Sequence, residues 1–133
     1  MDGLGEDAPA AVEINAAYPA AEGNTLDNLK AAAAGENEEW TTLYADFDKV
    51  AAEEGFPEVA MAFKMISKVE EKHEARYLKL ADNIEKGMVF KKDGKVKWKC
   101  RNCGYIHEGD TAPGICPACL HKQEYYEVFV ENY

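Results

Sequence analysis

Two long stretches of the chain repeat apolar residues at steps of three and four, the spacing of an amphipathic α-helix. In the first stretch these residues are Leu26, Leu29, Trp40, Leu43, Phe47 and Val50. In the second stretch they are Val59, Phe63, Ile66, Val69, Tyr77, Leu80 and Ile84. The pattern therefore predicts two helices of about 30 residues each, which is long for a globular protein.

The residues at the ends of these stretches support that prediction. Asn24 or Thr25 can cap the first helix, and Gly55 can end it. Pro57 suits the first turn of the second helix, and Gly87 suits its end. Because the join between them is so short, we expect the helices to lie side by side and antiparallel.

After Gly87 the pattern changes to short alternating runs. Residues 88–91 and 96–99 flank an Asp-Gly pair at 93–94, which predicts a β-hairpin, and residues 125–130 read as a returning strand. The predicted fold class is α plus small β: a connector or tail over 1–24, a helical hairpin over 25–87 and a β module over 88–133. A module of roughly 45 residues is too small to be stable through its apolar core alone, so it needs disulfide bonds or a bound metal.

Four cysteines can provide this stabilisation. They form a C-x2-C-x12-C-x2-C array of Cys100, Cys103, Cys116 and Cys119. Two cysteine turns at this separation suit one tetrahedral S4 site, which holds iron or zinc. Two disulfides are the alternative, but the rest of the chain contains no cysteine, and paired CxxC turns are more typical of a metal site.

Composition narrows the possible partners. Acidic residues outnumber basic ones 25 to 15, and the net charge is −10. This charge argues against nucleic acid or an anionic membrane surface as a partner. No apolar run approaches the roughly 18 residues that span a bilayer. Cysteines confined to a metal motif indicate a reducing compartment, and we expect the cytoplasm.

The two predicted helices also carry metal-ligand types at helical spacing. Glu36 and Glu39 are three residues apart and share a face, and Glu70 with His73 forms a Glu-x-x-His motif. Measured from the turn near residue 56, Glu39 and Glu70 differ in level by only about 4–5 Å. The pairs can therefore meet. Three other carboxylates are interpreted as surface charges: Glu38, Glu71 and Glu74.

Carboxylates and an imidazole that meet inside a helical bundle require cations, because an unpaired buried charge costs several kcal/mol. Two metal ions would supply the compensating charge. Glu-x-x-His together with further Glu residues on facing helices is how ferritin-like di-iron proteins build their centre.

With these motifs together, the chain resembles the rubrerythrin family from Val12 to Tyr133. The resemblance rests on the stretches TLDNLKAAAAGENEEW (25–40), EEKHEARY (70–77) and WKCRNCGY (98–105). It implies a ferritin-like di-iron bundle followed by a rubredoxin-like Fe(Cys)4 domain. It also implies that Glu36, Glu39, Glu70 and His73 are di-iron ligands, that Tyr44 hydrogen-bonds near them, and that the four cysteines bind one iron.

The resemblance further implies that two helices of the family's bundle, with part of its metal site, are missing from this chain. Half a bundle leaves an exposed apolar stripe, for which we expect Trp40, Phe47, Phe63, Ile66 and Tyr77. We therefore expect a partner that completes the four helices and shares the di-iron centre. That partner is a second copy related by a two-fold axis or a separate chain; alternatively, the chain is a fragment of a longer protein that carries the two helices itself.

The function implied by the resemblance is reduction of hydrogen peroxide at the di-iron centre. Electrons would come from reduced rubredoxin or a similar carrier, ultimately from NAD(P)H, and pass through the Fe(Cys)4 site, whose potential Asn102 and His121 can tune. Two alternatives stay open. The chain is only an electron carrier because half the bundle is missing, or zinc fills the cysteines and the chain is a structural module.

Overall fold

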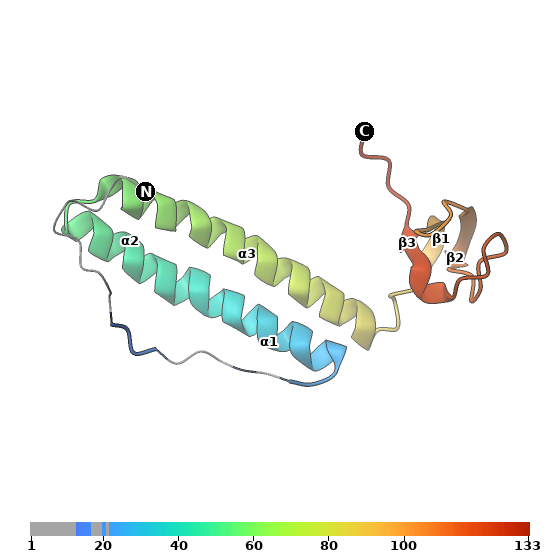
Figure 1. Ribbon diagram of the computed structural model, residues 1–133, viewed down its shortest axis with the longest axis horizontal. Coiled ribbons are helices and arrows are strands. Elements are labelled where there is room, and N and C mark those ends of the chain that lie inside the picture. The colour runs from blue at the N-terminus through green and yellow to red at the C-terminus, as the bar shows by residue number, and fades with distance from the viewer. Residues whose placement is uncertain (1–12, 17–19, 21) are drawn as a thin grey trace.

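The chain folds as a long helical hairpin followed by a small antiparallel sheet (Figure 1). A computed structural model describes residues 13–16, 20 and 22–133. The connector predicted for residues 1–24 falls mostly outside the described residues. The predicted fold class, a helical part followed by a β module, is confirmed.

The first arm of the hairpin is one continuous helix with an irregular turn in its middle. It consists of α1 (Thr25–Glu38), the π-helical turn η1 (Glu39–Leu43) and α2 (Tyr44–Glu53). Of the two possible caps, Asn24 is the one used, because its side chain accepts a hydrogen bond of 3.0 Å from the backbone N–H of Asp27.

The second arm is α3 (Pro57–Glu85), which begins at the predicted proline. Gly55 has a φ of +84° and lets the chain reverse between the arms. Gly87 has a φ of +64°, and the following N–H of Met88 bonds to Asn83 O at 2.7 Å. This closure of the last turn explains why the helix ends where the glycine predicts.

The two arms pack through small residues. Within the described helices, the buried apolar residues are all alanines: Ala33, Ala51, Ala60 and Ala81. The large apolar side chains stay at least partly exposed. Of the predicted exposed stripe, Phe47 and Ile66 are 44% and 38% exposed, whereas Trp40, Phe63 and Tyr77 are half-buried. The hairpin therefore has no large buried side chain of its own.

The C-terminal part is a three-stranded antiparallel sheet. Its strands are β1 (Lys91–Cys100), β2 (Ile106–Thr111) and β3 (Tyr126–Val128), in the order β2-β1-β3. A short 3-10 turn, Gln123–Tyr125, leads into β3. The core that the sheet encloses consists of Trp98, Cys100, Ala112, Cys116 and Tyr126.

The predicted hairpin around the Asp-Gly pair is wrong. Lys91 pairs with Thr111 and Val96 pairs with Gly109, so the chain on both sides of residues 93–94 pairs with β2 rather than with itself. The Asp-Gly pair lies in a bulge of β1. The returning strand is confirmed but is shorter than predicted, at Tyr126–Val128. The cysteine loops bring β2 and β3 against β1, and this long-range pairing overrides the local turn signal.

Among the described residues, no helix has the length and apolar character that crossing a membrane requires.

Candidate metal centres

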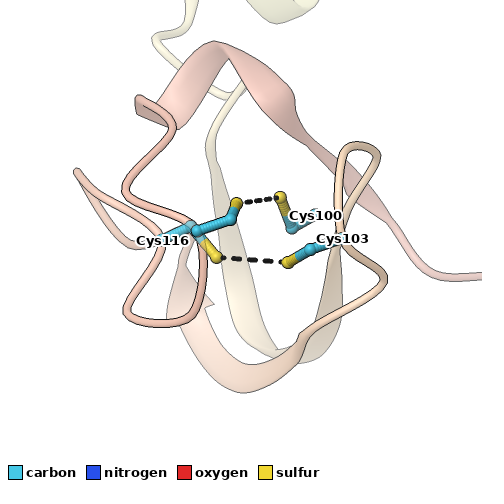
Figure 2. Close-up of side chains that lie close together, drawn as sticks. Cys100, Cys103 and Cys116 are labelled. Carbon is cyan, nitrogen blue, oxygen red and sulfur yellow. Dashed lines mark hydrogen bonds between the residues drawn. The ribbon is translucent and has the colours of Figure 1, made fainter.

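The four cysteines converge at one end of the sheet and are not disulfide-bonded (Figure 2). The sulfurs of Cys100 and Cys119 are 3.7 Å apart, and so are those of Cys103 and Cys116. A tetrahedral ion with metal–sulfur bonds of about 2.3 Å separates its sulfurs by about 3.8 Å. The spacing therefore fits one S4 metal site and is too long for any S–S bond. We call these four residues the cysteine site.

Two loops of matching geometry hold the cysteine site. In the first, the N–H of Gly104 bonds to Cys100 O at 2.8 Å, and in the second the N–H of Leu120 bonds to Cys116 O at 2.9 Å. Each loop needs a left-handed residue after its second cysteine. Gly104 adopts this conformation with a φ of +82°, and Leu120 adopts it with a φ of +62°. The left-handed conformation is sterically unfavourable for Leu120, because its Cβ approaches the backbone. This explains why Leu120 fits the motif less well than Gly104.

The thiols are electrostatically unequal. Burial raises the pKa of Cys116, but the adjacent Tyr126 hydroxyl and backbone N–H groups of its own loop outweigh burial and lower that pKa to about 6. A backbone hydrogen bond at Tyr105 lowers the pKa of Cys103, but loss of solvent and its contacts with the other sulfurs raise it to about 12. Of these two sulfurs, that of Cys116 therefore carries negative charge more readily than that of Cys103.

A second group of ligand types lies in the middle of the hairpin. Glu36 comes from α1, and Glu70 and His73 come from α3. Their potential ligand atoms all lie within 4.8 Å of one another. Nδ1 of His73 is 2.6 Å from Oε2 of Glu70 and 3.6 Å from Oε1 of Glu36. We call these three residues the helical cluster. The hairpin thus brings together three of the four predicted di-iron ligands.

The helical cluster has the electrostatics of an incomplete cation site. Oε2 of Glu36 is buried and has no hydrogen-bond partner among the described residues. Burial, followed by the neighbouring Glu70, raises the pKa of Glu36. The side chains of Glu36 and Glu70 are 16% and 13% exposed, and that of His73 is 45% exposed. A cation bound against Glu36 would satisfy the orphaned oxygen and offset the repulsion between the carboxylates, so the donor set fits a metal.

Glu39 and Tyr44 are not members of the helical cluster. Glu39 opens the π-helical turn, and its charge adds to the effects that raise the pKa of Glu36. The ring of Tyr44 is stacked on Phe63 with centroids 5.9 Å apart and meets Phe47 edge-on. The roles of Glu39 as a ligand and of Tyr44 as a hydrogen-bonding neighbour stay predictions.

The sequence analysis missed the structural role of one polar residue near the helical cluster. Glu74, interpreted as a surface charge, accepts hydrogen bonds from Trp40 Nε1 at 2.6 Å and from Asn37 Nδ2 at 3.1 Å. That interpretation is wrong, because the contacts cross the hairpin. Glu74 follows Glu70 by four residues and so shares its face of the helix, a signal that was available in the sequence.

The π-helical turn itself lies next to the helical cluster. A π turn displaces the regular hydrogen bonds of a helix and is often found at functional sites. Here Ser67 of α3 donates a hydrogen bond to Trp40 O at 3.1 Å, within this turn. The contact ties the irregular turn to the facing helix close to Glu36.

Two family models match the chain, and each covers one of the two candidate centres. The model described as "Rubrerythrin" matches residues 4–81, which include the helical cluster. The model described as "Rubrerythrin, rubredoxin-like domain" matches residues 98–127, which include all four cysteines. The β module is therefore rubredoxin-like, as the resemblance implied.

Curated relatives agree with these matches. The chain is 62% identical over 124 residues to a rubrerythrin of Clostridium perfringens, covering 92% of this chain and 64% of the relative. It is 52% identical over 123 residues to a rubrerythrin of Porphyromonas gingivalis, covering 92% of this chain and 62% of the relative. The chain thus spans less than two thirds of the length of these relatives.

Among solved structures, the chain is similar to one described as the fully reduced, all-ferrous state of nigerythrin. The identity is 30%, the match covers 91% of this chain and 56% of that chain, and the TM-score is 0.47.

Proposed function

Because this chain belongs to the rubrerythrin family, we propose that it reduces hydrogen peroxide to water at an iron pair held by its helices. The chain is a rubrerythrin-type non-haem iron protein with a rubredoxin-like domain. The observation that carries the proposal is the helical cluster, in which Glu36, Glu70 and His73 bring their ligand atoms within 4.8 Å of one another. An electron carrier with only the cysteine site would have no need of this cluster.

Reduction of hydrogen peroxide takes two electrons and two protons and releases two water molecules, and a pair of ferrous ions supplies one electron from each ion. The side chains of this hairpin would hold that pair. Glu36, Glu39 and Glu70 would supply negative charge, and the imidazole of His73 would supply a nitrogen ligand. The half-buried position of Glu36 and Glu70 limits access of water to their carboxylates.

Tyr44 is proposed to donate a hydrogen bond near the iron pair. Its ring is held by the stack on Phe63 and by the edge contact with Phe47, at centroid distances of 5.9 Å and 6.2 Å. Such packing limits the rotamers open to the ring and so keeps the hydroxyl in one place. This role would be one of positioning, because the hydroxyl is not itself a ligand.

The cysteine site is proposed to relay electrons to the iron pair. Thiolate-bound iron changes its charge with little change of geometry, which suits a relay. The donor would be reduced rubredoxin or a similar small carrier, supplied ultimately by NAD(P)H through a reductase. A reducing compartment, for which we propose the cytoplasm, keeps the cysteines free to bind iron.

Within one chain the two centres are far apart. From His73 to the end of α3 at Glu85 the helix rises about 18 Å, and the module lies beyond that end (Figure 1). The relay would therefore serve the iron pair of another copy, brought close by assembly. This arrangement makes an oligomer part of the proposed function.

The proposal is tested by metal analysis together with peroxide consumption on the full chain. An S4 ferric site is red and is bleached by dithionite, whereas zinc is colourless. We expect iron in both centres and, with a reduced carrier, loss of one peroxide for every two electrons. Glu70→Gln should abolish that consumption and leave the red colour, and Glu71→Gln, one residue away, should change neither.

The alternatives give different results in the same experiment. Iron confined to the cysteine site, with no peroxide consumption, would mean that the chain is only an electron carrier. A colourless chain with one zinc would mean a structural module. Either result would overturn the proposed activity.

A further inference from the structure

The hydroxyl of Tyr126 is a buried polar group in the β module. Tyr126 is the first residue of β3 and is 4% exposed, and its hydroxyl makes no hydrogen bond to another described residue. A buried hydroxyl that gives up its hydrogen bonds to water and gains none in return is destabilising. Native proteins keep few such groups, so the position of this hydroxyl requires an explanation.

The core around the hydroxyl offers sulfur as its acceptor. The members of this core besides Tyr126 are Trp98, Cys100, Ala112 and Cys116. The side chains of Trp98 and Ala112 contain no acceptor atom, and Trp98 Nε1 already donates to Gly109 O at 3.1 Å. The two cysteines are fully buried. Among the side chains of this core, the sulfurs are therefore the atoms that can accept a hydrogen bond from Tyr126.

The pairing of β3 with β1 determines where the ring of Tyr126 points. Tyr126 lies opposite Cys100 in the register of the two strands, so both side chains lie on the same face of the sheet. The N–H of Arg101 donates to Tyr125 O at 2.8 Å and holds the start of β3 against the first cysteine loop. Backbone contacts thus direct the ring into the core, and they do not depend on its hydroxyl.

Within the core, the hydroxyl lies beside the sulfur of Cys116. Burial raises the pKa of Cys116, but the Tyr126 hydroxyl and the backbone N–H groups of the second loop lower it to about 6. Burial also raises the pKa of Tyr126, and the neighbouring Cys116 raises it further, so the hydroxyl keeps its proton at neutral pH. A neutral thiol is a weak acceptor, whereas a metal-bound thiolate is negatively charged and a strong one.

We propose that Tyr126 donates a hydrogen bond to the metal-bound thiolate of Cys116 and thereby raises the reduction potential of the cysteine site. Tyr126 is then a positioning residue, because it acts on the iron through Cys116. The inference rests on the part of the proposed function in which the cysteine site holds iron. It is independent of the helical cluster.

The direction of the effect follows from charge. Four thiolates and one ferric ion have one net negative charge, and the electron from the donor increases it to two. No bond forms or breaks in this step, and the proton stays on Tyr126. A hydroxyl directed at sulfur stabilises the more negative ferrous state more than the ferric state. Because the surroundings are buried, water screens this interaction little.

The hydrogen bond would influence both halves of the proposed relay. A higher potential favours transfer of an electron from the reduced carrier to the cysteine site. The same shift lowers the driving force for the next transfer, from the cysteine site to the iron pair. Tyr126 would therefore help to set how much of the cysteine site is reduced at a given potential of the carrier.

The first experiment compares Tyr126→Phe with the parent chain, both with iron in the cysteine site. Phenylalanine keeps the ring and removes only the hydroxyl. A potentiometric titration, followed through the red ferric colour, should show a lower potential for the variant. A roughly tenfold shift of the equilibrium between the ferric and ferrous states would lower it by about 59 mV. The sulfur-to-iron charge-transfer bands should move to longer wavelength, because the donor no longer stabilises the electrons of the sulfur.

Tyr125→Phe is the matched control. Tyr125 precedes Tyr126 in the chain, is 42% exposed, and packs its ring edge-on against His121 at a centroid distance of 4.4 Å. This change removes a tyrosine hydroxyl outside the core and should leave the potential and the spectrum as in the parent chain. No fall in the potential of Tyr126→Phe, or an equal fall in both variants, would overturn the proposal.

The second experiment uses the parent chain, so it decides the question even if Tyr126→Phe fails to fold. Cadmium with a spin-active nucleus is placed in the cysteine site, because thiolates bind such soft metal ions well. In the NMR spectrum, the hydroxyl proton of Tyr126 should show a scalar coupling to the metal through the sulfur of Cys116. A hydroxyl proton without this coupling, or one that exchanges with water too fast to be observed, would overturn the proposal.

The outcomes separate this inference from the proposed function. A lower potential in Tyr126→Phe, in a chain that consumes no peroxide, would support the inference and overturn the activity. Peroxide consumption by a chain in which the parent and Tyr126→Phe have the same potential would do the reverse.

Discussion

Trp40 Nε1 donates a hydrogen bond of 2.6 Å to Oε2 of Glu74 across the hairpin. The contact joins the π-helical turn of the first arm to α3 one turn beyond Glu70. Asn37 reinforces it with Nδ2 at 3.1 Å and 3.2 Å from the two oxygens of the same carboxylate. Together with the hydrogen bond from Ser67 to Trp40 O, this polar contact fixes the position of the first arm along α3.

Trp40→Phe, which removes the donor, and Glu74→Leu, which removes the acceptor, should each destabilise the hairpin. Loss of a partly buried hydrogen bond to a charged acceptor costs about 1.5–3 kcal/mol. We expect thermal unfolding followed by circular dichroism to show this loss for both variants. Glu71→Gln is the control, because Glu71 is exposed and pairs with its neighbour Lys72, and it should have little effect. Equal effects at positions 71 and 74 would contradict the assigned contact.

Glu36→Gln should stabilise the metal-free chain while removing helical iron. The pKa of Glu36 is raised by burial and by Glu70, so the folded chain binds its proton more tightly than the unfolded chain does. The stability of the metal-free chain should therefore fall as pH rises above about 4.3, the ordinary Glu value. The glutamine variant should flatten this fall. Urea unfolding of both proteins between pH 4 and 7, with chelator present, measures the difference, and a steeper fall in the variant would refute the assignment.

Metal removal should unfold the β module and leave the hairpin helical. The core of the module consists of five residues, of which two are metal ligands, so little apolar surface remains to hold the sheet once the cysteines are free. Trp98 is 1% exposed, and in a Trp40→Phe background it is the remaining tryptophan. A strong chelator should shift its fluorescence to the red. Unchanged fluorescence would show that the sheet is stable without metal.

Leu120→Gly should stabilise the β module by about 1 kcal/mol. Leu120 has a φ of +62°, which glycine adopts without the steric cost of a Cβ. The side chain is 76% exposed, so little packing is lost with it. Leu120→Ala is the matched control, because alanine removes the apolar side chain but keeps the Cβ. Denaturant unfolding of the iron-loaded protein should place the alanine variant near the parent chain and the glycine variant above it.

Much of the helical part was predictable from local features of the sequence. Helix periodicity, the cap at Asn24 and the stops at Gly55 and Gly87 act within a few residues, and the structure places the helix ends where these signals lie. The Glu-x-x-His motif and each of the two CxxC pairs are likewise short patterns whose members a single turn or loop brings together. These parts of the site were therefore predictable.

The pairing of the strands was not predictable from the sequence. The Asp-Gly pair is a strong local turn signal, but the partner of β1 is chosen by contacts that are distant in the sequence. The residues of β2, Ile106–Thr111, show no apolar alternation that would have revealed a strand. Their place is determined by the loops that carry the cysteines, and these loops close only when all four sulfurs converge.

The sequence by itself determined which residues can bind metal and which helices carry them, because ligand type and helical spacing are local properties. Only the tertiary structure decided the register of the two arms, which places Glu36 beside Glu70 and His73 and turns Glu74 toward Trp40. The reason is physical. Periodicity specifies the face of a helix, but the level at which two helices meet depends on the turn, the alanines between them and the polar contacts that cross the gap.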